Sequence, residues 1–288
     1  EPKKMNTIPI IDTHFHIWNT NHVTLEWLEA FSSLKKIYTL EDYDVAMKSQ
    51  NLTKSCYTEV DVIKGDLTKE SDYIVGVCKD KSNLVTALTL GGDLFRNDFS
   101  AYIHKYHKTG YVKSVRHNFF ACDPDSITEA IFIQNTKLLG KLNLMFNLTM
   151  LADFMPFGLK LVQQCPETRF IIDHCGFYPM KGNPELIQQW RKGISKYAAE
   201  KNTICKISEF CFTRPEYKWK IEDVVSVIKH CADSFGDDRI IYGSNWPVCE
   251  ITGSVDLWFD ALNEAFKNKP QSFWHKLLHQ NAELYYEI

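Results

Sequence analysis

The 288-residue sequence has little of the features that mark several specialised classes of protein. It contains no apolar run close to the roughly 20 residues that span a bilayer. Neither sign of charge is in large excess, since 33 basic residues stand against 36 acidic ones and the net charge is −3. Such a balance creates no field that would collect nucleic acid or an anionic membrane surface. We therefore expect no nucleic-acid or membrane partner, and a small, weakly polar molecule instead.

Paired cysteines and flexible linkers are missing as well. The nine cysteines are odd in number and include no CxxC pair, so they indicate neither a disulfide framework nor a zinc ribbon. Cys56, Cys205 and Cys231 lie inside apolar segments, which favours free core thiols and a cytoplasmic location. No Gly/Ser-rich tract or internal repeat marks a second domain. We expect an N-terminal extension at residues 1–7 and one domain at 8–288.

Eight short apolar runs are present, separated by stretches with helical periodicity. The runs cover residues 8–16, 54–60, 84–90, 111–116, 144–149, 169–174, 203–208 and 239–243. In one intervening stretch, apolar residues recur every four positions from Leu186 to Ala198, which is typical of a helix packed on one side. Strands that are apolar throughout are expected in a parallel sheet covered on both faces. Strict alternation then allows an open doubly wound sheet or a closed barrel.

Polar residues at the ends of these runs distinguish the two architectures. They are His14, His16, Glu59, Arg116, His117, Thr149, His174, Ser208, Glu209 and Asn245. In a closed barrel all strand ends meet at one rim, where the active sites of such folds are built. We therefore predict an α/β fold, a single-domain (β/α)8 TIM barrel. The segment 20–38 is longer than most connections and carries Trp27 and Phe31, so we predict a lid over this rim.

Three histidines are the first candidates for chemistry. His14 and His16 are two residues apart, so on a strand their side chains point to the same side. Imidazoles in that position can ligate a metal or donate hydrogen bonds to a developing oxyanion. An isolated His-x-His pair is more often fortuitous or structural, but His174 on the same predicted rim favours the functional interpretation. Asn245 follows the last strand, where an asparagine can also simply complete a turn.

Five segments in order carry a resemblance to a known family. They are Asp-Thr-His-Phe-His-Ile-Trp at 12–18, Val-Arg-His at 115–117, Phe-Ile-Ile-Asp-His-Cys-Gly at 170–176, Gly-Ser-Asn-Trp-Pro-Val at 243–248 and Asn-Ala at 281–282. Together they resemble the amidohydrolase superfamily, and within it the lactonases that include L-fuconolactonase, L-rhamnonolactonase and pyrone-dicarboxylate lactonase. The resemblance covers nearly the whole chain. It implies hydrolysis of a sugar-acid or carboxylated lactone, a small-molecule partner, at the barrel mouth.

The resemblance also implies roles for individual residues. His14, His16 and His174 match histidines that polarise the lactone carbonyl or, in some members, hold a divalent ion. The position of Asn245 normally carries an aspartate that takes a proton from the attacking water. An amide has no basic lone pair and cannot do so. Three explanations stay open: an engineered inactivating change, a natural member with another base, or a barrel that only binds.

Further residues are expected to contact the substrate. They are Arg116, His117, Glu59, Trp18 and Trp246, with Glu209 and Lys206 as weaker candidates; Glu59 could equally be a solvated carboxylate. Lactone opening needs no metal, because imidazole donors can polarise the carbonyl. If a metal is bound, we expect one divalent ion such as Zn²⁺ on His14, His16, Glu59 and His174. The alternatives are a metal-dependent decarboxylase or other hydrolase, and a non-catalytic metabolite-binding barrel; homo-oligomerisation is left open.

Overall fold

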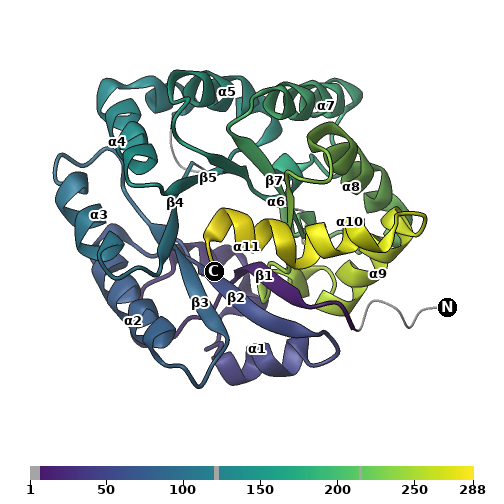
Figure 1. The fold of residues 1–288 in the computed structure, drawn as a ribbon, viewed down its shortest axis with the longest axis horizontal. Coiled ribbons are helices and arrows are strands. Elements are labelled where there is room, and N and C mark those ends of the chain that lie inside the picture. The colour runs from purple at the N-terminus through teal and green to yellow at the C-terminus, as the bar shows by residue number, and fades with distance from the viewer. Residues whose placement is uncertain (1–6, 120–122, 214–215) are drawn as a thin grey trace.

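The computed structural model describes residues 7–119, 123–213 and 216–288. Within these residues eight parallel strands are hydrogen-bonded to one another in sequence order, as Figure 1 shows. The strands are β1 (Ile10–Phe15), β2 (Leu52–Thr58), β3 (Val85–Gly91), β4 (Val112–Asn118), β5 (Met145–Thr149), β6 (Phe170–Ile172), β7 (Thr203–Ser208) and β8 (Ile240–Gly243). Each overlaps one of the eight predicted runs.

The last strand returns to the first and closes the ring. Phe15, the last residue of β1, forms a parallel bridge with Trp246, which lies three residues beyond the end of β8. Two backbone bonds flank it, from His16 N to Trp246 O at 2.8 Å and from Asn245 N to His14 O at 2.8 Å. The closure therefore brings the His-x-His segment and the Asn245 turn side by side. The predicted α/β fold, a single-domain (β/α)8 barrel, is confirmed.

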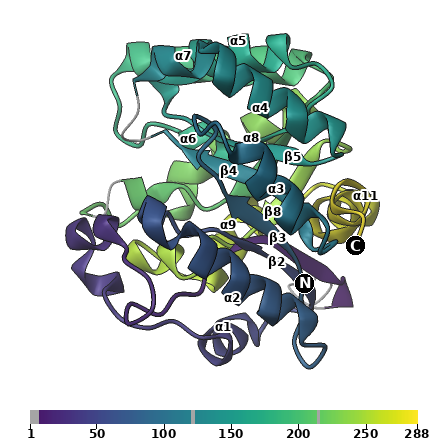
Figure 2. The same cartoon turned by 90° about the vertical axis from the view of Figure 1, so that its left-hand side faces the viewer.

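Most helices surround the barrel on its outside, and the C-terminal helix lies across one end of it (Figures 1 and 2). In the described residues they are α1 (Leu40–Met47), α2 (Leu67–Lys79), α3 (Phe99–His107), α4 (Ala130–Lys141), α5 (Met155–Gln164), α6 (His174–Phe177), α7 (Pro184–Ala199), α8 (Ile221–Phe235), α9 (Val255–Phe266), α10 (Gln271–His275) and α11 (Asn281–Tyr286). Local chemistry sets their ends: Asn183 Oδ1 accepts from Leu186 N at 2.8 Å and caps α7, as its Asn-Pro start predicts. No helix here is long and apolar enough to cross a bilayer.

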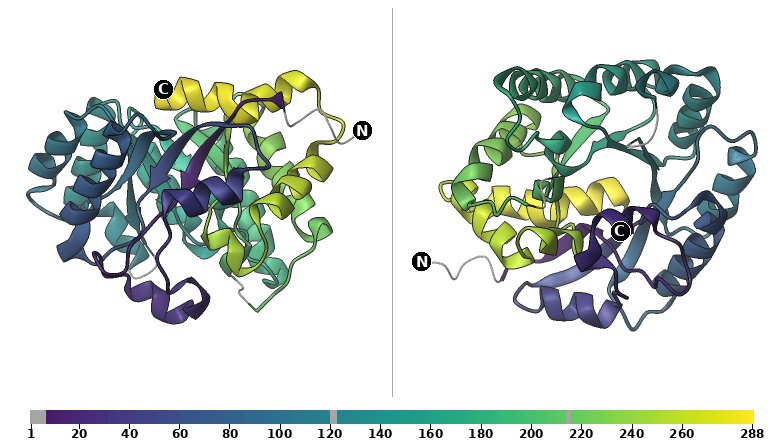
Figure 3. Two further views of the ribbon diagram at one scale, coloured as in Figure 1. Left: turned by 90° about the horizontal axis from the view of Figure 1, so that it is seen from below. Right: turned by 180° about the vertical axis from the view of Figure 1, so that it is seen from behind.

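The barrel interior is apolar at one end and polar at the other. The apolar layer consists of Ile11, Cys56, Ala87, Met145, Ile171, Ile204 and Ile241, closed from below by Ala282 and Tyr286 of α11. Figure 3 places this C-terminal helix and the segment 20–38 at opposite ends of the barrel. Above the apolar layer lie buried polar side chains, among them Asn147, Asp173 and Lys206.

Other features of the chain stand as follows. Of the predicted extension 1–7, only Thr7 is described; the rest lies outside the described residues. The eight cysteines in the described part of the chain are buried and free. The predicted lid contains two short 3-10 helices, Glu26–Ala30 and Ser32–Leu34. It is anchored by the indole N–H of Trp27, which donates to Val60 O at 2.8 Å beyond the end of β2.

Candidate active site

Two turns with left-handed backbone position the site. His174, Cys175, Gly176 and Phe177, which make up α6, have φ between +49° and +66°, and Asn245 has φ +59°. Left-handed backbone costs about 1–2 kcal/mol for each residue with a Cβ, so the surrounding packing must hold it in place. Gly176 adopts its φ without strain, and a Cβ there would lie 2.6 Å from Met155 Cε, so a larger residue would require that side chain to shift. Strained turns of this kind concentrate at functional sites.

A buried carboxylate, Asp12, joins the first of the two histidine segments to the Asn245 turn. Asp12 Oδ1 accepts from His14 N at 3.0 Å and from Ser244 N at 2.9 Å. Its Oδ2 accepts from the hydroxyls of Ser244 at 2.6 Å and Tyr43 at 2.8 Å. The aspartate thus fixes β1 relative to the turn that follows β8. Sequence reasoning noted Asp12 only as a letter of a motif and assigned it no role.

The three predicted histidines meet. The ring centroids of His14 and His16 are 4.9 Å apart, and those of His14 and His174 are 4.4 Å apart. All three are buried, and burial lowers the pKa of His16 and His174 to about 3 and that of His14 well below its usual value. The cluster is therefore neutral at physiological pH.

Hydrogen-bond partners assign the tautomers of these neutral rings. His16 Nδ1 lies 2.8 Å from Thr58 O and His174 Nδ1 lies 2.8 Å from Glu209 O. A carbonyl only accepts, so both Nδ1 atoms carry the proton and both Nε2 atoms keep a lone pair. His14 Nδ1 instead lies 3.3 Å from the Lys206 ammonium, a donor, and 3.8 Å from Asp173 Oδ1, an acceptor. The shorter contact favours the tautomer with the His14 proton on Nε2. That Nε2 has no hydrogen-bond partner within the described part of the chain.

A pocket opens over this cluster at the rim. Its polar lining consists of His16, Asp61, Arg116, Asn118, Thr149, His174 and Asn245. Its apolar lining consists of Trp27, Phe31, Val60, Phe177, Phe212, Val248 and Ile251. Trp27 and Phe31 come from the segment predicted as a lid, so that segment forms a wall of the pocket. Ring contacts place His14 directly against His16 and His174 of this lining.

The Asn245 amide is held by Glu209. Its Nδ2 lies 3.2 Å from Glu209 O and 3.4 Å from Glu209 Oε2. Burial raises the pKa of the Glu209 carboxyl to about 7. The amide therefore faces a carboxyl group that is partly protonated at neutral pH. Glu209, a weak candidate from the sequence, lies behind Asn245 rather than in the pocket wall.

Arg116 and Glu59 form a buried ion pair, in which Arg116 Nε bonds Glu59 Oε1 and Nη2 donates to Glu59 O at 2.6 Å. Glu59 Oε2 in turn accepts from Asp61 N at 2.7 Å. Asp61 itself lines the pocket, and burial together with the Glu59 charge raises its pKa to about 6. Asp61 was missed from the sequence, although it lies only two residues beyond the polar end of the second strand.

Besides Glu59, three predicted contact residues do not line this pocket. The indole N–H groups of Trp18 and Trp246 donate to Lys36 O and Glu250 Oε1, both at 2.8 Å, and both rings are buried. His117 Nδ1 lies 3.0 Å from Gly92 O, and its ring packs on Phe132. The interpretation of these three side chains as pocket walls is therefore corrected. Their rings gain more from core packing than from exposure at the rim.

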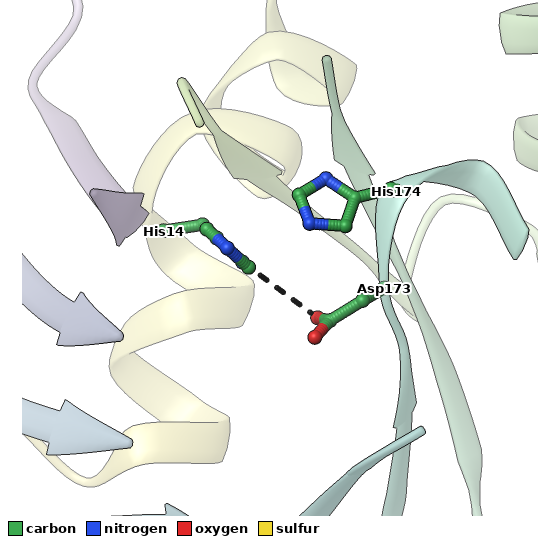
Figure 4. A group of neighbouring side chains, drawn as sticks. All are labelled: His14, Asp173 and His174. Atoms are coloured by element: carbon green, nitrogen blue, oxygen red, sulfur yellow. Dashed lines mark ion pairs between the residues drawn. The ribbon is translucent and has the colours of Figure 1, made fainter. Parts of the chain in front are cut away.

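The predicted metal ligands are corrected as well. The ligand atoms that lie within 4.8 Å of one another belong to His14, Asp173 and His174, which Figure 4 shows together. Glu59 is held by Arg116 and is not part of the cluster, nor is His16. Although burial acts to raise it, the Lys206 ammonium holds the pKa of Asp173 well below its usual range. Asp173 was not predicted as a ligand.

The cluster fits a metal poorly as it stands. Lys206 Nζ lies 3.2 Å from Asp173 Oδ1 and 3.3 Å from His14 Nδ1, so the ammonium contacts two of the three residues that a metal would use. A protonated lysine has no lone pair to give to an ion and adds a charge that repels it.

Comparisons with known proteins agree with the fold. The family model described as Amidohydrolase matches residues 11–288. An L-fucono-1,5-lactonase from Burkholderia ambifaria is 24% identical over 245 residues, which cover 84% of this chain and 82% of that protein. An amidohydrolase from Burkholderia multivorans, solved with bound Zn, has a TM-score of 0.87 at 18% identity and covers 97% and 99%. A 2,6-dihydroxybenzoate decarboxylase from Rhizobium has a TM-score of 0.65 at 11% identity and covers 98% and 99%.

Proposed function

The chain belongs to the amidohydrolase family, and from that premise we propose that it hydrolyses a lactone with water as the nucleophile. One observation carries this proposal. Three neutral, buried imidazoles meet beneath a small rim pocket, next to one arginine and the side chain of Asn245. Opening a cyclic ester requires a polarised carbonyl and an oriented water molecule, and both can be supplied by such groups.

Negative charge develops on the carbonyl oxygen as water attacks. The Arg116 guanidinium lines the pocket, so it is available to stabilise that oxygen. The His14 Nε2–H has no hydrogen-bond partner in the described residues, but it lies beneath the lining rings of His16 and His174, so it acts on that oxygen only when the substrate reaches between these rings. His16 and His174 present Nε2 lone pairs that can accept a hydrogen bond from water. With pKa values of about 3, however, these two imidazoles are weak bases.

The step that this site performs badly is proton removal from the water. Asn245 lines the pocket but its amide cannot take a proton. We therefore expect this chain to bind a lactone and to open it slowly. The lactonase relative supports a sugar-acid lactone as the substrate class, and a carboxylated lactone is the second candidate. Arg116 is the proposed contact for a hydroxyl of the first or the carboxylate of the second.

Steady-state hydrolysis of a panel of aldonolactones and carboxylated lactones tests the proposal. The panel is measured with the present chain and with Asn245→Asp, each corrected for spontaneous ring opening. Asn183→Asp is the matched control, because it makes the same change at a surface helix cap where aspartate serves equally well. If both the present chain and the Asn245→Asp protein are folded and neither opens any lactone above background, the proposed function is wrong.

A further inference from the structure

A lysine lies inside the barrel, in the middle of β7. The Lys206 side chain has no exposed surface, and its Nζ is 3.2 Å from Asp173 Oδ1 and 3.3 Å from His14 Nδ1. Both residues belong to the group that would hold a metal. In a tetrahedral zinc site with bonds of about 2.1 Å, two ligand atoms lie about 3.4 Å apart. The ammonium therefore contacts the prospective ligands as closely as a further ligand of the same ion would.

An ammonium in this place acts as the cation. It has three donors and no acceptor, while the Asp173 carboxylate and His14 Nδ1 are both acceptors that face it. The Asn147 amide completes the bonding of the carboxylate, with its Nδ2 3.0 and 3.1 Å from the two oxygens. Asp173 thus already has a positive partner and a neutral donor before any ion arrives.

The charges also balance. The Asp173 carboxylate and the Lys206 ammonium are fully buried and 3.2 Å apart, so the two charges neutralise one another. A divalent ion added to this group would leave two uncompensated positive charges in the barrel interior, unless the lysine gave up its proton. Uncompensated buried charge is strongly unfavourable.

We propose that the Lys206 ammonium is the resident cation of the cluster of His14, Asp173 and His174, and that it fixes the His14 proton on Nε2. The cluster then operates without a divalent metal, and Lys206 is a positioning residue that acts through His14. The use of the His14 Nε2–H in lactone opening rests on the proposed function. The identity of the cation does not.

Two measurements on the unmodified protein test this directly. The protein is dialysed against zinc and then against buffer, and its zinc content is measured. Because the cluster should hold no zinc, the Asp173→Asn protein should contain as much zinc as the unmodified one. The ¹⁵N signals of labelled histidines, assigned by loss of the His14 signal in His14→Gln, should show a protonated Nε2 and an unprotonated Nδ1. One zinc per chain that Asp173→Asn removes, or a proton on His14 Nδ1, overturns the proposal.

A lysine variant provides the converse test. Lys206→Met keeps the apolar stem and removes the charge, so zinc affinity should rise by at least about 10³-fold and fall again when Asp173→Asn is added. Lys113→Met, on β4 and outside the cluster, is the control and should not bind zinc more tightly. A folded Lys206→Met protein with unchanged zinc affinity contradicts the proposal. If that variant does not fold, the metal content and tautomer of the unmodified protein decide. None of these readouts depends on lactone turnover.

Discussion

The substitution Asn245→Asp places a carboxylate at the pocket floor, where the present amide cannot accept a proton. General-base assistance typically contributes about 10²–10⁴-fold, and we expect turnover to rise on this scale. Lactone binding should change much less, because His14, Arg116 and the apolar walls are untouched. The gain should therefore be found in kcat rather than in KM.

The surroundings of Asn245 modify the expected pH dependence. An aspartate at this position would face Glu209 Oε2, which lies 3.4 Å from the present Nδ2. Two like charges about 4 Å apart repel by about 4 kcal/mol at an effective dielectric constant of 20. Because the pKa of Glu209 is already raised to about 7, Glu209 is the group expected to stay protonated. The two carboxyls should titrate as a pair.

The double substitution Asn245→Asp with Glu209→Gln removes this coupling. Its rate should rise with pH through a single ionisation, that of the new aspartate, since only the ionised form is a base. Proton release is followed with an indicator and corrected for spontaneous opening, and melting curves confirm that the compared proteins are folded. If Asn245→Asp adds nothing while Asp61→Asn abolishes an already fast reaction, then Asp61 is the base and our assignment of Asn245 as the limiting residue is wrong.

Three further substitutions have defined outcomes. Arg116→Lys should lower kcat/KM by about 10–100-fold in the Asn245→Asp background, because lysine cannot make both bonds to Glu59 and still face the pocket. Burial raises the pKa of Glu70 to about 8, so the folded state resists its ionisation and the free energy of unfolding should fall as the pH rises from 4.5 to 8. Glu70→Gln should abolish this fall, which urea unfolding across the range measures. Gly176→Ala should cost about 2–4 kcal/mol of unfolding free energy, because alanine strains the φ of +66° and contacts Met155; equal stability would refute this.

The barrel and the position of its rim could be predicted from the sequence because each depends on local patterns. Parallel strands buried on both faces are apolar throughout, and the polar residue that ends each strand marks the rim. This reasoning brought His14, His16, His174 and Asn245 to one place, where the structure has them. Only the strand ends moved, most clearly at β6, which stops at Ile172 because a left-handed turn begins at His174.

Residues whose role depends on where the side chain points, rather than on its place in the sequence, were harder to predict. Trp18 lies two residues after His16 and Trp246 directly follows Asn245, but the backbone turns both rings into the core. Glu59 ends its strand as expected, yet an arginine two strands away holds its carboxylate, and the pocket receives Asp61 instead. Such pairings depend on the register between strands that are far apart in the sequence, and no local pattern contains that register.

Lys206 and Asn245 both make the site more positive than it would be with an aspartate at 245 and an uncharged side chain at 206. An amide at 245 removes one negative charge from the rim, and an ammonium beside Asp173 supplies a positive charge. Both residues weaken the binding of a divalent ion to the cluster. Such an ion is bound most stably by ionised or lone-pair ligands without a competing cation. The two residues differ in their effect on chemistry, because the lysine still leaves a donor on His14 whereas the amide leaves no base. Metal content should therefore respond most strongly to position 206, and proton transfer to position 245.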